Sequence, residues 1–180
     1  MAVLERIQQK SFLGAEFATW LWYRAEEHDG AVDAGGGKSC RVEFESDLTL
    51  TSDYGEATAS ALRGDAPTLS PEAAAALAAG KKVRRARVRV TWENFTWILT
   101  LNALTFDWGG LRVEVPPSLP FEEALPLRLR SVEEFHRVFA LLYGRFLDVR
   151  LDAEEWRAEE KRMREWVASK SAAERDARKA

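Results

Sequence analysis

Hydrophobic residues recur with a helical period near the start of the chain. Within residues 12–27, Leu13, Phe17, Trp20 and Leu21 follow one another at the three- and four-residue spacing of an amphipathic α-helix. Other apolar residues cover much of the remaining surface of this segment. The sequence therefore predicts a helix that is buried from several sides.

The hydrophobic period changes to two in the middle of the chain. A glycine-rich polar stretch at 27–39 predicts a loop, and alternation of apolar with polar residues over 41–53 then predicts a strand. The same alternation predicts a hairpin of strands at 83–92 and 95–104, followed by a third strand over 105–115. Because hairpin neighbours run in opposite directions, we expect an antiparallel sheet.

Helix-boundary signals flank the predicted strands. Ser70, followed by proline, begins a short alanine-rich helix that Gly80 ends. The proline-rich stretch 116–126 predicts an extended connector. In the final third, a capping box at 131–134 and an N-cap at Asp152 predict two further helices.

Together these elements predict one α+β domain. We expect residues 1–168 to form an antiparallel sheet with helices packed on one face and further helices at the C-terminal end. A chain of 180 residues is long enough to bury a core of this kind. Residues 169–180 lack apolar anchors and are predicted to be a polar, disordered tail.

Charge is distributed unevenly along the chain, whose formal net charge is -3. Residues 1–80 contain 13 acidic and 6 basic residues, whereas residues 81–120 contain 7 basic and 3 acidic residues. Most of the bases in the second region form one cluster: Lys81, Lys82, Arg84, Arg85, Arg87 and Arg89. Such a cluster in an acidic chain indicates an anionic partner or an internal pairing of the two regions.

The basic cluster falls on the first strand of the predicted hairpin. Alternation places Arg85, Arg87 and Arg89 on one face about 6.8 Å apart, close to the phosphate spacing of a nucleic-acid strand. The planar guanidinium group also suits phosphate. Contacts to nucleic acid are therefore predicted for Lys81, Lys82, Arg85, Arg87 and Arg89. Two alternatives stay open: a solvated edge strand protected from aggregation by its charge, and pairing with the acidic segment 31–72.

No motif in the sequence indicates an enzyme. The segment 35–39, GGGKS, looks like the end of a phosphate-binding loop, but Val32 stands where that motif needs an earlier glycine. His28 and His136 are the only histidines, and neither has further metal ligands at helical spacing beyond ordinary acids. No metal or other cofactor is therefore expected.

Two single residues and the overall hydropathy add to this picture. Glu16 lies inside the aromatic helix, where it could carry a proton if burial raises its pKa, or could pair with a nearby arginine. Cys40 is the only cysteine, which excludes an internal disulfide and suits a reducing cytoplasm. No run of about 18 apolar residues exists, so no membrane span is expected.

Three segments of the chain together carry a family resemblance. They are FLGAEFATWLWYRAEE at 12–27, EAAAALAAGKKVRRARV at 72–88, and LLYGRFLDVRL with EEWRAEEKRMREWV at 141–167. In this order they resemble the C-terminal portion of a divergent, short branch of the RdgC-type recombination-associated proteins. Ala15 departs from the arginine expected at that place in the family.

The resemblance implies a non-enzymatic protein that binds duplex DNA without sequence preference, as a ring-shaped dimer, and restrains recombinase activity. Full members of the family are longer, and their N-terminal portion has no counterpart here. We therefore expect a homodimer or a separately encoded partner protein, in the cytoplasm and associated with the nucleoid.

A protein-interaction subunit is the alternative function. The chain carries many large aromatic residues for a core of its size, among them Trp20, Trp22, Trp156 and Trp166. Helices that expose some of these side chains could dock to a larger partner, with the arginines facing an acidic protein surface.

Overall fold

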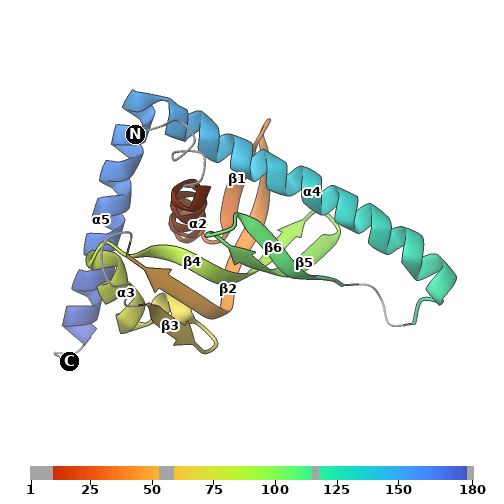
Figure 1. Cartoon of the computed structure of the whole chain (residues 1–180), viewed down its shortest axis with the longest axis horizontal. Helices are drawn as coiled ribbons and strands as arrows, with labels where there is room; N and C mark the ends of the chain where they lie inside the picture. The colour runs from red at the N-terminus through yellow and green to blue at the C-terminus, as the bar shows by residue number, and fades with distance from the viewer. Residues whose placement is uncertain (1–9, 53–58, 115–117, 178–180) are drawn as a thin grey trace.

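The computed structural model describes residues 10–52, 59–114 and 118–177 (Figure 1). In chain order the elements are α2 (Lys10–Glu27), β1 (Ala31–Gly35), β2 (Lys38–Thr51), β3 (Ser60–Arg63), the 3-10 helix η1 (Pro67–Leu69), α3 (Pro71–Ala78), β4 (Lys82–Trp92), β5 (Phe95–Asn102), β6 (Asp107–Val113), α4 (Phe121–Leu151) and α5 (Ala153–Ala177). Within these residues, six antiparallel strands pair in the order β1-β2-β4-β5-β6, with β3 beside β2. The predicted α+β class is confirmed.

The helices α2 and α4 cover one face of the sheet. α2 packs directly on β4 and β1. α4 runs across the same face of the sheet, and the N-terminal end of α4 extends beyond the sheet (Figure 1). α5 turns back from the end of α4 and lies beside α3. The other face of β4 and β5 carries half-exposed polar side chains between buried apolar neighbours.

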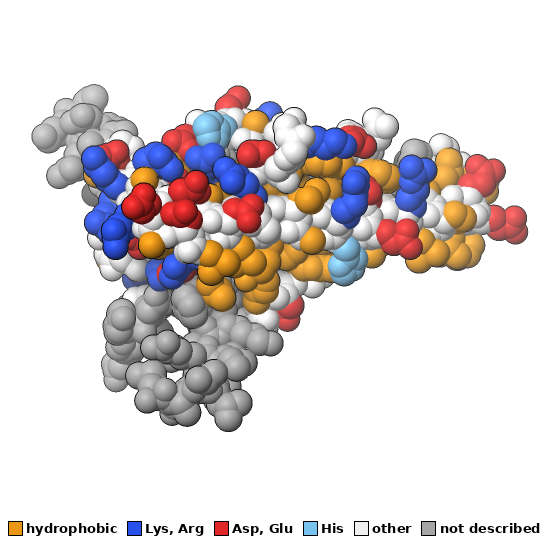
Figure 2. Space-filling view, turned by 90° about the horizontal axis from the view of Figure 1, so that it is seen from above, with side chains coloured by type: hydrophobic (Ala, Val, Ile, Leu, Met, Phe, Trp, Pro, Cys, Tyr) orange, Lys and Arg blue, Asp and Glu red, His pale blue; other side chains and the backbone are white. Residues whose placement is uncertain are grey.

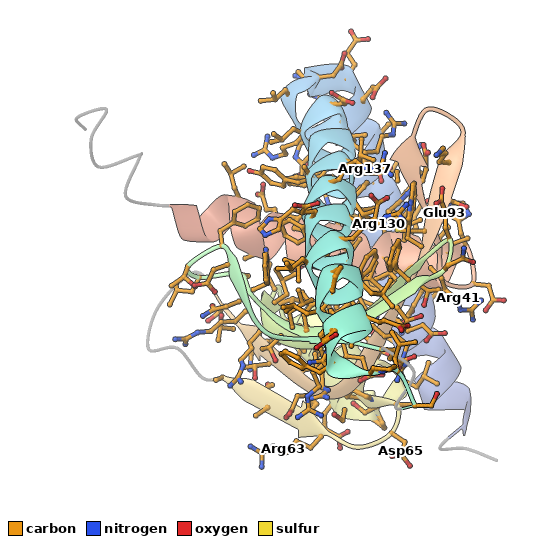
Figure 3. All side chains as sticks on the ribbon, turned by 90° about the vertical axis from the view of Figure 1, so that its right-hand side faces the viewer. Arg41, Arg63, Asp65, Glu93, Arg130 and Arg137 are labelled. Carbon is orange, nitrogen blue, oxygen red and sulfur yellow. The ribbon has the colours of Figure 1, made fainter. Side chains whose placement is uncertain are left out.

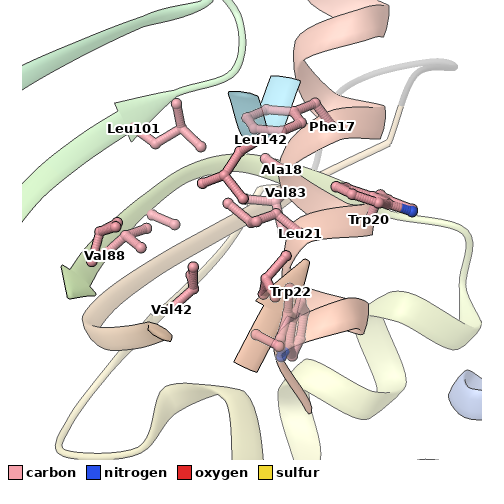
Figure 4. Packing of buried hydrophobic residues seen from close by; sticks show 14 of the residues in the cluster. Phe17, Ala18, Trp20, Leu21, Trp22, Val42, Val83, Val88, Leu101 and Leu142 are labelled. Carbon is pink, nitrogen blue, oxygen red and sulfur yellow. The ribbon is translucent and has the colours of Figure 1, made fainter. Parts of the chain in front are cut away.

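The core lies between α2 and the sheet. Figure 4 shows Phe17 and Leu21 of α2 close to Val83 of β4 and to Leu142 of α4, with Val88 of β4 further along the same layer. All five side chains are at most 3% exposed. Since burying such a side chain contributes about 1.5–3 kcal/mol, this layer accounts for much of the stability, as the helical period of residues 12–27 predicts.

Gly14 lets α2 approach the chain that follows β5. A Cβ atom added at Gly14 would collide with the backbone oxygen of Ala103 and lie 2.9 Å from the Phe106 ring. We therefore expect Gly14→Ala to lower the free energy of unfolding by about 1–3 kcal/mol, because the backbone must move. The matched control is Gly144→Ala in α4, where nothing lies within 4 Å of the added atom. It should be neutral or stabilise by up to about 1 kcal/mol in urea unfolding; equal losses for both variants would contradict this packing.

The predicted loop at 27–39 is wrong for most of its length. Its middle forms β1, in which Val32 pairs with Cys40 of β2 and is 1% exposed. Gly36 and Gly37, with φ of 63° and 74°, supply the turn to β2. This strand has five residues, and only Val32 and Ala34 are buried. Its alternation is therefore too short to be recognised in a sequence that is otherwise rich in glycine.

The predicted extended connector at 116–126 is wrong from Phe121 onward, where α4 begins. The expected capping box therefore lies inside the helix. Ser131 is completely buried there, and its hydroxyl accepts a hydrogen bond of 2.8 Å from Trp97 Nε1. The helix runs through Pro126 despite its missing N–H group, which removes one backbone hydrogen bond. Ser131 is thus a hydrogen-bond partner of Trp97 inside the helix, although its spacing to the following glutamates is that of a helix N-cap.

The predicted disorder after residue 168 is wrong as far as Ala177, because α5 continues to that residue. Lys170 fixes this part of the helix: its Nζ lies 2.7 Å from Glu26 Oε2 and 5.3 Å and 5.4 Å from the ring centres of Trp22 and Trp166. Among residues 169–171, the part of this segment whose side chains the structure describes, the helix is thus held by a cation. The last three residues lie outside the described part of the chain.

Lys170→Met tests this anchor because it keeps the side-chain length and removes the charge. We expect the free energy of unfolding to fall by about 1–3 kcal/mol, since the variant loses charge-assisted hydrogen bonds to Glu26. The lysine side chain is only 14% exposed, so water replaces these bonds poorly. Lys161→Met, in the same helix, is the control: its pair with Glu165 is 3.9 Å long and exposed. Its effect should stay within about 0.5 kcal/mol, and identical melting of both variants would contradict the anchor.

Candidate nucleic-acid interface

The basic strand is β4, and its register separates core residues from charged ones. Ala86, Val88 and Val90 are buried, while the alternate residues Arg85 and Arg87 point to the opposite face. The predicted arrangement of this strand is therefore correct. We call the side of β2, β4, β5 and β6 opposite α2 and α4 the open face.

A bulge at the start of β4 sets this register. Leu50 of β2 pairs with Val83, and Thr49 pairs with Arg85, so Arg84 is the extra residue. Because of the bulge, both Val83 and Ala86 point into the core. It also leaves Arg84 exposed outside the alternating row.

Cross-strand pairing continues the open face across the sheet. Arg89 lies opposite Glu43 of β2 and Ile98 of β5, and Ile98 lies opposite Arg112 of β6. Directly paired residues share a face. The open face of β4 and β5 consists of Arg85, Arg87, Arg89, Thr91, Thr96, Ile98, Thr100 and Asn102. The surface is thus polar, with arginines in its middle strand.

Acidic side chains bind two arginines of this row. Glu45 accepts hydrogen bonds from Arg89 Nε at 2.8 Å and from Arg87 Nε at 3.2 Å, and Glu114 accepts one from Arg89 Nη1 at 3.0 Å. The pKa of Arg89 is raised, chiefly by the hydrogen bond to Glu45. Pairing with the acidic segment 31–72, which was one open alternative, is therefore present. The side chains of Arg87 and Arg89 remain 30% and 32% exposed.

Glu45 reaches both arginines because of an irregularity in β2. Phe44 pairs with Val88 and Leu48 with Ala86, so three residues of β2 lie opposite Arg87 alone. Neither the number of intervening residues nor their position follows from the hydrophobic pattern. The identity of the acid that pairs with Arg87 and Arg89 could not be predicted for this reason.

Lys81 and Lys82 do not join the arginine row. Lys81 Nζ donates a hydrogen bond of 2.8 Å to Ser60 Oγ, and Lys82 Nζ lies 3.6 Å from Glu16 Oε1 on α2. Glu16 also accepts a hydrogen bond of 2.7 Å from Arg150 Nε. The paired alternative for Glu16 is therefore correct, and the five predicted residues separate into an open-face row and a lysine pair beside α2.

Further arginines near the open face were missed by sequence reasoning. Arg41 of β2 lies opposite Thr91, and Figure 3 shows Arg41 and Arg63 of β3 pointing away from the body. Arg41 Nε is 2.7 Å from Glu43, and Arg63 Nε is 3.3 Å from Asp47. Single arginines on different strands give no sequence signal, because only strand pairing brings them together.

The remaining titratable candidates are structural. Burial raises the pKa of the Cys40 thiol to about 12, and burial with the nearby Glu27 and Glu159 carboxylates raises the pKa of Tyr23 to about 12. Both groups therefore stay protonated at neutral pH. The His136 ring packs at 4.8 Å on Trp108, and His28 Nε2 lies 3.3 Å from Glu27. The described residues include no group of three or more acids, histidines or cysteines placed to hold a metal ion.

No family model, curated protein or solved structure matches this chain. The resemblance to RdgC-type proteins therefore stays a prediction that rests on the three sequence segments. None of the helices in the described residues is long and apolar enough to cross a membrane.

Proposed function

We propose that this protein binds the backbone of duplex DNA through the open face, without reading base sequence and without catalysis. The observation that supports this most directly is the row of Arg85, Arg87 and Arg89 on the face of β4 opposite its buried residues. Arginines repeated along a strand can each meet a phosphate, and their planar donors suit its oxygens. On the RdgC-type resemblance, we further propose that the protein acts in the cytoplasm and that its DNA binding serves to control recombination.

The composition of the open face favours duplex DNA over single strands. Its β4 and β5 residues are arginine, threonine, isoleucine and asparagine. Proteins that hold single strands usually stack bases on aromatic side chains, and this set of residues offers none. Threonine and arginine side chains instead suit contacts to phosphate and sugar.

The ion pairs of Glu45 regulate how strongly the row attracts DNA in this proposal. Phosphates must displace or share the carboxylates that hold Arg87 and Arg89, whereas Arg85 is exposed. Binding should thus be weak and salt-sensitive. A dimer or a separately encoded partner protein would increase it by presenting two faces to one duplex.

A salt titration of the whole chain with fluorescent duplex and single-stranded oligonucleotides tests the proposal. If the three arginines each contact one phosphate of duplex DNA, the logarithm of the binding constant should fall linearly with the logarithm of the salt concentration, with a slope of about -2.7. Different duplex sequences should give the same affinity. Failure to bind duplex at low salt, or preference for one sequence, would overturn the proposal.

A protein-interaction subunit is the second candidate, and one feature of α4 favours it. Where α4 extends beyond the sheet, Phe121, Leu125 and Leu129 are 71%, 44% and 59% exposed. They recur every four residues on one side of the helix, and Figure 2 shows hydrophobic side chains gathered at this end of the molecule.

The tryptophans predicted for docking lie elsewhere. Trp20 and Trp22 are 2% and 0% exposed, and Trp166 packs on Trp22 with ring centres 5.3 Å apart. Trp20 and Trp22 therefore offer no docking surface, whereas Trp156 and Trp166 are half-buried. If α4 is a docking surface, Leu125→Gln should abolish association seen by light scattering while DNA binding persists.

A further inference from the structure

A groove of about 660 Å³ lies between α5 on one side and α2, α3 and the start of β4 on the other. Its wall on α5 extends from Trp156 to Ser171. Fifteen residues of helix correspond to about 22 Å. The groove is therefore long, and none of its lining residues belongs to the open face.

Part of the groove wall is apolar. Trp156, Met163 and Val167 contribute from α5, and Leu77 contributes from α3. Trp156 is fixed by Phe146, with ring centres 6.1 Å apart, and by the Arg150 guanidinium, 4.7 Å from its ring centre. The wall is thus held in place before any ligand binds, which lowers the entropic cost of binding.

One rim of the groove is cationic. Lys81 and Lys82 both line it, and Lys81 Nζ makes its hydrogen bond to the neutral hydroxyl of Ser60. Glu16, the acid beside Lys82, also pairs with Arg150 at 2.7 Å, so its negative charge is shared between two cations. Glu160, the other acid of the lining, pairs with Arg164 at 3.2 Å, so the three bases and two acids that line the groove carry a net charge of +1.

We propose that the groove binds a small amphiphilic anion. Its apolar chain would lie along Met163 and Val167, and a single carboxylate or comparable anionic head would be held by Lys81 and Lys82. The volume is typical of small-molecule sites, which are mostly apolar with a few polar groups that fix orientation. This site goes beyond the proposed DNA binding and uses none of the open-face arginines.

Calorimetric titration with sodium dodecanoate, below its micelle concentration, tests the proposal. We expect one molecule bound per chain, and an affinity about tenfold lower in the double variant Lys81→Gln with Lys82→Gln. Dodecyltrimethylammonium, with the same chain and opposite charge, should bind at least about tenfold more weakly. Hexanoate should bind more than about a hundredfold more weakly, because six fewer methylene groups are buried.

Variants in the groove and outside it separate this site from general hydrophobic adsorption. Val167→Gln should weaken dodecanoate binding, as should Ala168→Arg at the exposed rim if the first variant is unstable. Leu129→Gln, which removes an exposed leucine of α4, should leave it unchanged. Equal binding of the anion and the cation, unchanged binding in both groove variants, or no binding at all would overturn the proposal.

The outcome does not depend on DNA binding. A variant with Arg85, Arg87 and Arg89 changed to glutamine should bind dodecanoate like the wild type. If instead a long acidic peptide or a second copy of the chain binds the groove and dodecanoate does not, the small-molecule assignment is wrong.

Discussion

Replacing Trp20 with alanine is expected to lower the free energy of unfolding by about 3–5 kcal/mol. The ring is 2% exposed and packs on Phe146 at 5.6 Å between ring centres. Its Nε1 donates a hydrogen bond of 2.8 Å to Glu159, whose side chain is 2% exposed. The substitution thus leaves a cavity and also removes a donor from a buried carboxylate, which is costly when unsatisfied.

Two companion variants make this result interpretable in urea unfolding. Trp20→Phe keeps most of the ring but loses the donor, so it should cost less than the alanine variant and more than zero. Leu151→Ala removes a side chain that is 79% exposed and should change stability by less than about 0.5 kcal/mol. If Trp20→Ala melts like Leu151→Ala, the position of α2 in the core is wrong.

Changing Arg85, Arg87 and Arg89 together to glutamine is expected to reduce duplex DNA affinity similarly for all sequences. The salt slope should decrease in magnitude by about 2–3, because up to three phosphate contacts are lost. The fold should persist, since Val88, Val90 and Trp92 on the other side of β4 remain in place. Circular dichroism and anisotropy on the same sample report both results.

The control for this variant removes equal charge elsewhere. Arg128, Arg130 and Arg157 are exposed on α4 and α5, and changing them to glutamine makes the same change in net charge. Only the open-face variant should alter the salt slope. Unfolding of that variant would mean that the row is structural, and equal binding by both variants would mean that overall charge alone attracts DNA.

The parts of the fold that could be predicted are those in which one segment carries its own signal. The spacing of Phe17, Trp20 and Leu21 predicted α2, and alternation predicted the β4–β5 hairpin. Ser70 was also correctly placed as an N-cap, where its side chain accepts a hydrogen bond from Ala73 N. In each case the period or the capping residue is local.

The parts that could not be predicted depend on distant residues. The register irregularity of β2 brings Glu45 to Arg87 and Arg89, more than 40 positions away in sequence. Trp97 requires the buried Ser131, and Lys170 reaches Glu26 across 144 positions. Hydrophobic periodicity contains no information on such pairs, so pairing of the basic row with the acidic segment 31–72 could be given only as an alternative, and Glu45 could not be named as the partner.

The most direct test of DNA binding through the open face is duplex affinity of Glu45→Gln measured beside the wild type. If Arg87 and Arg89 bind phosphate, removing their shared carboxylate should raise affinity about fivefold, corresponding to about 1 kcal/mol for a partly exposed pair. Glu122→Gln, an exposed acid on α4, makes the same charge change and should have little effect. An equal increase in both variants, or an unchanged affinity in a folded Glu45→Gln, would contradict binding through this face.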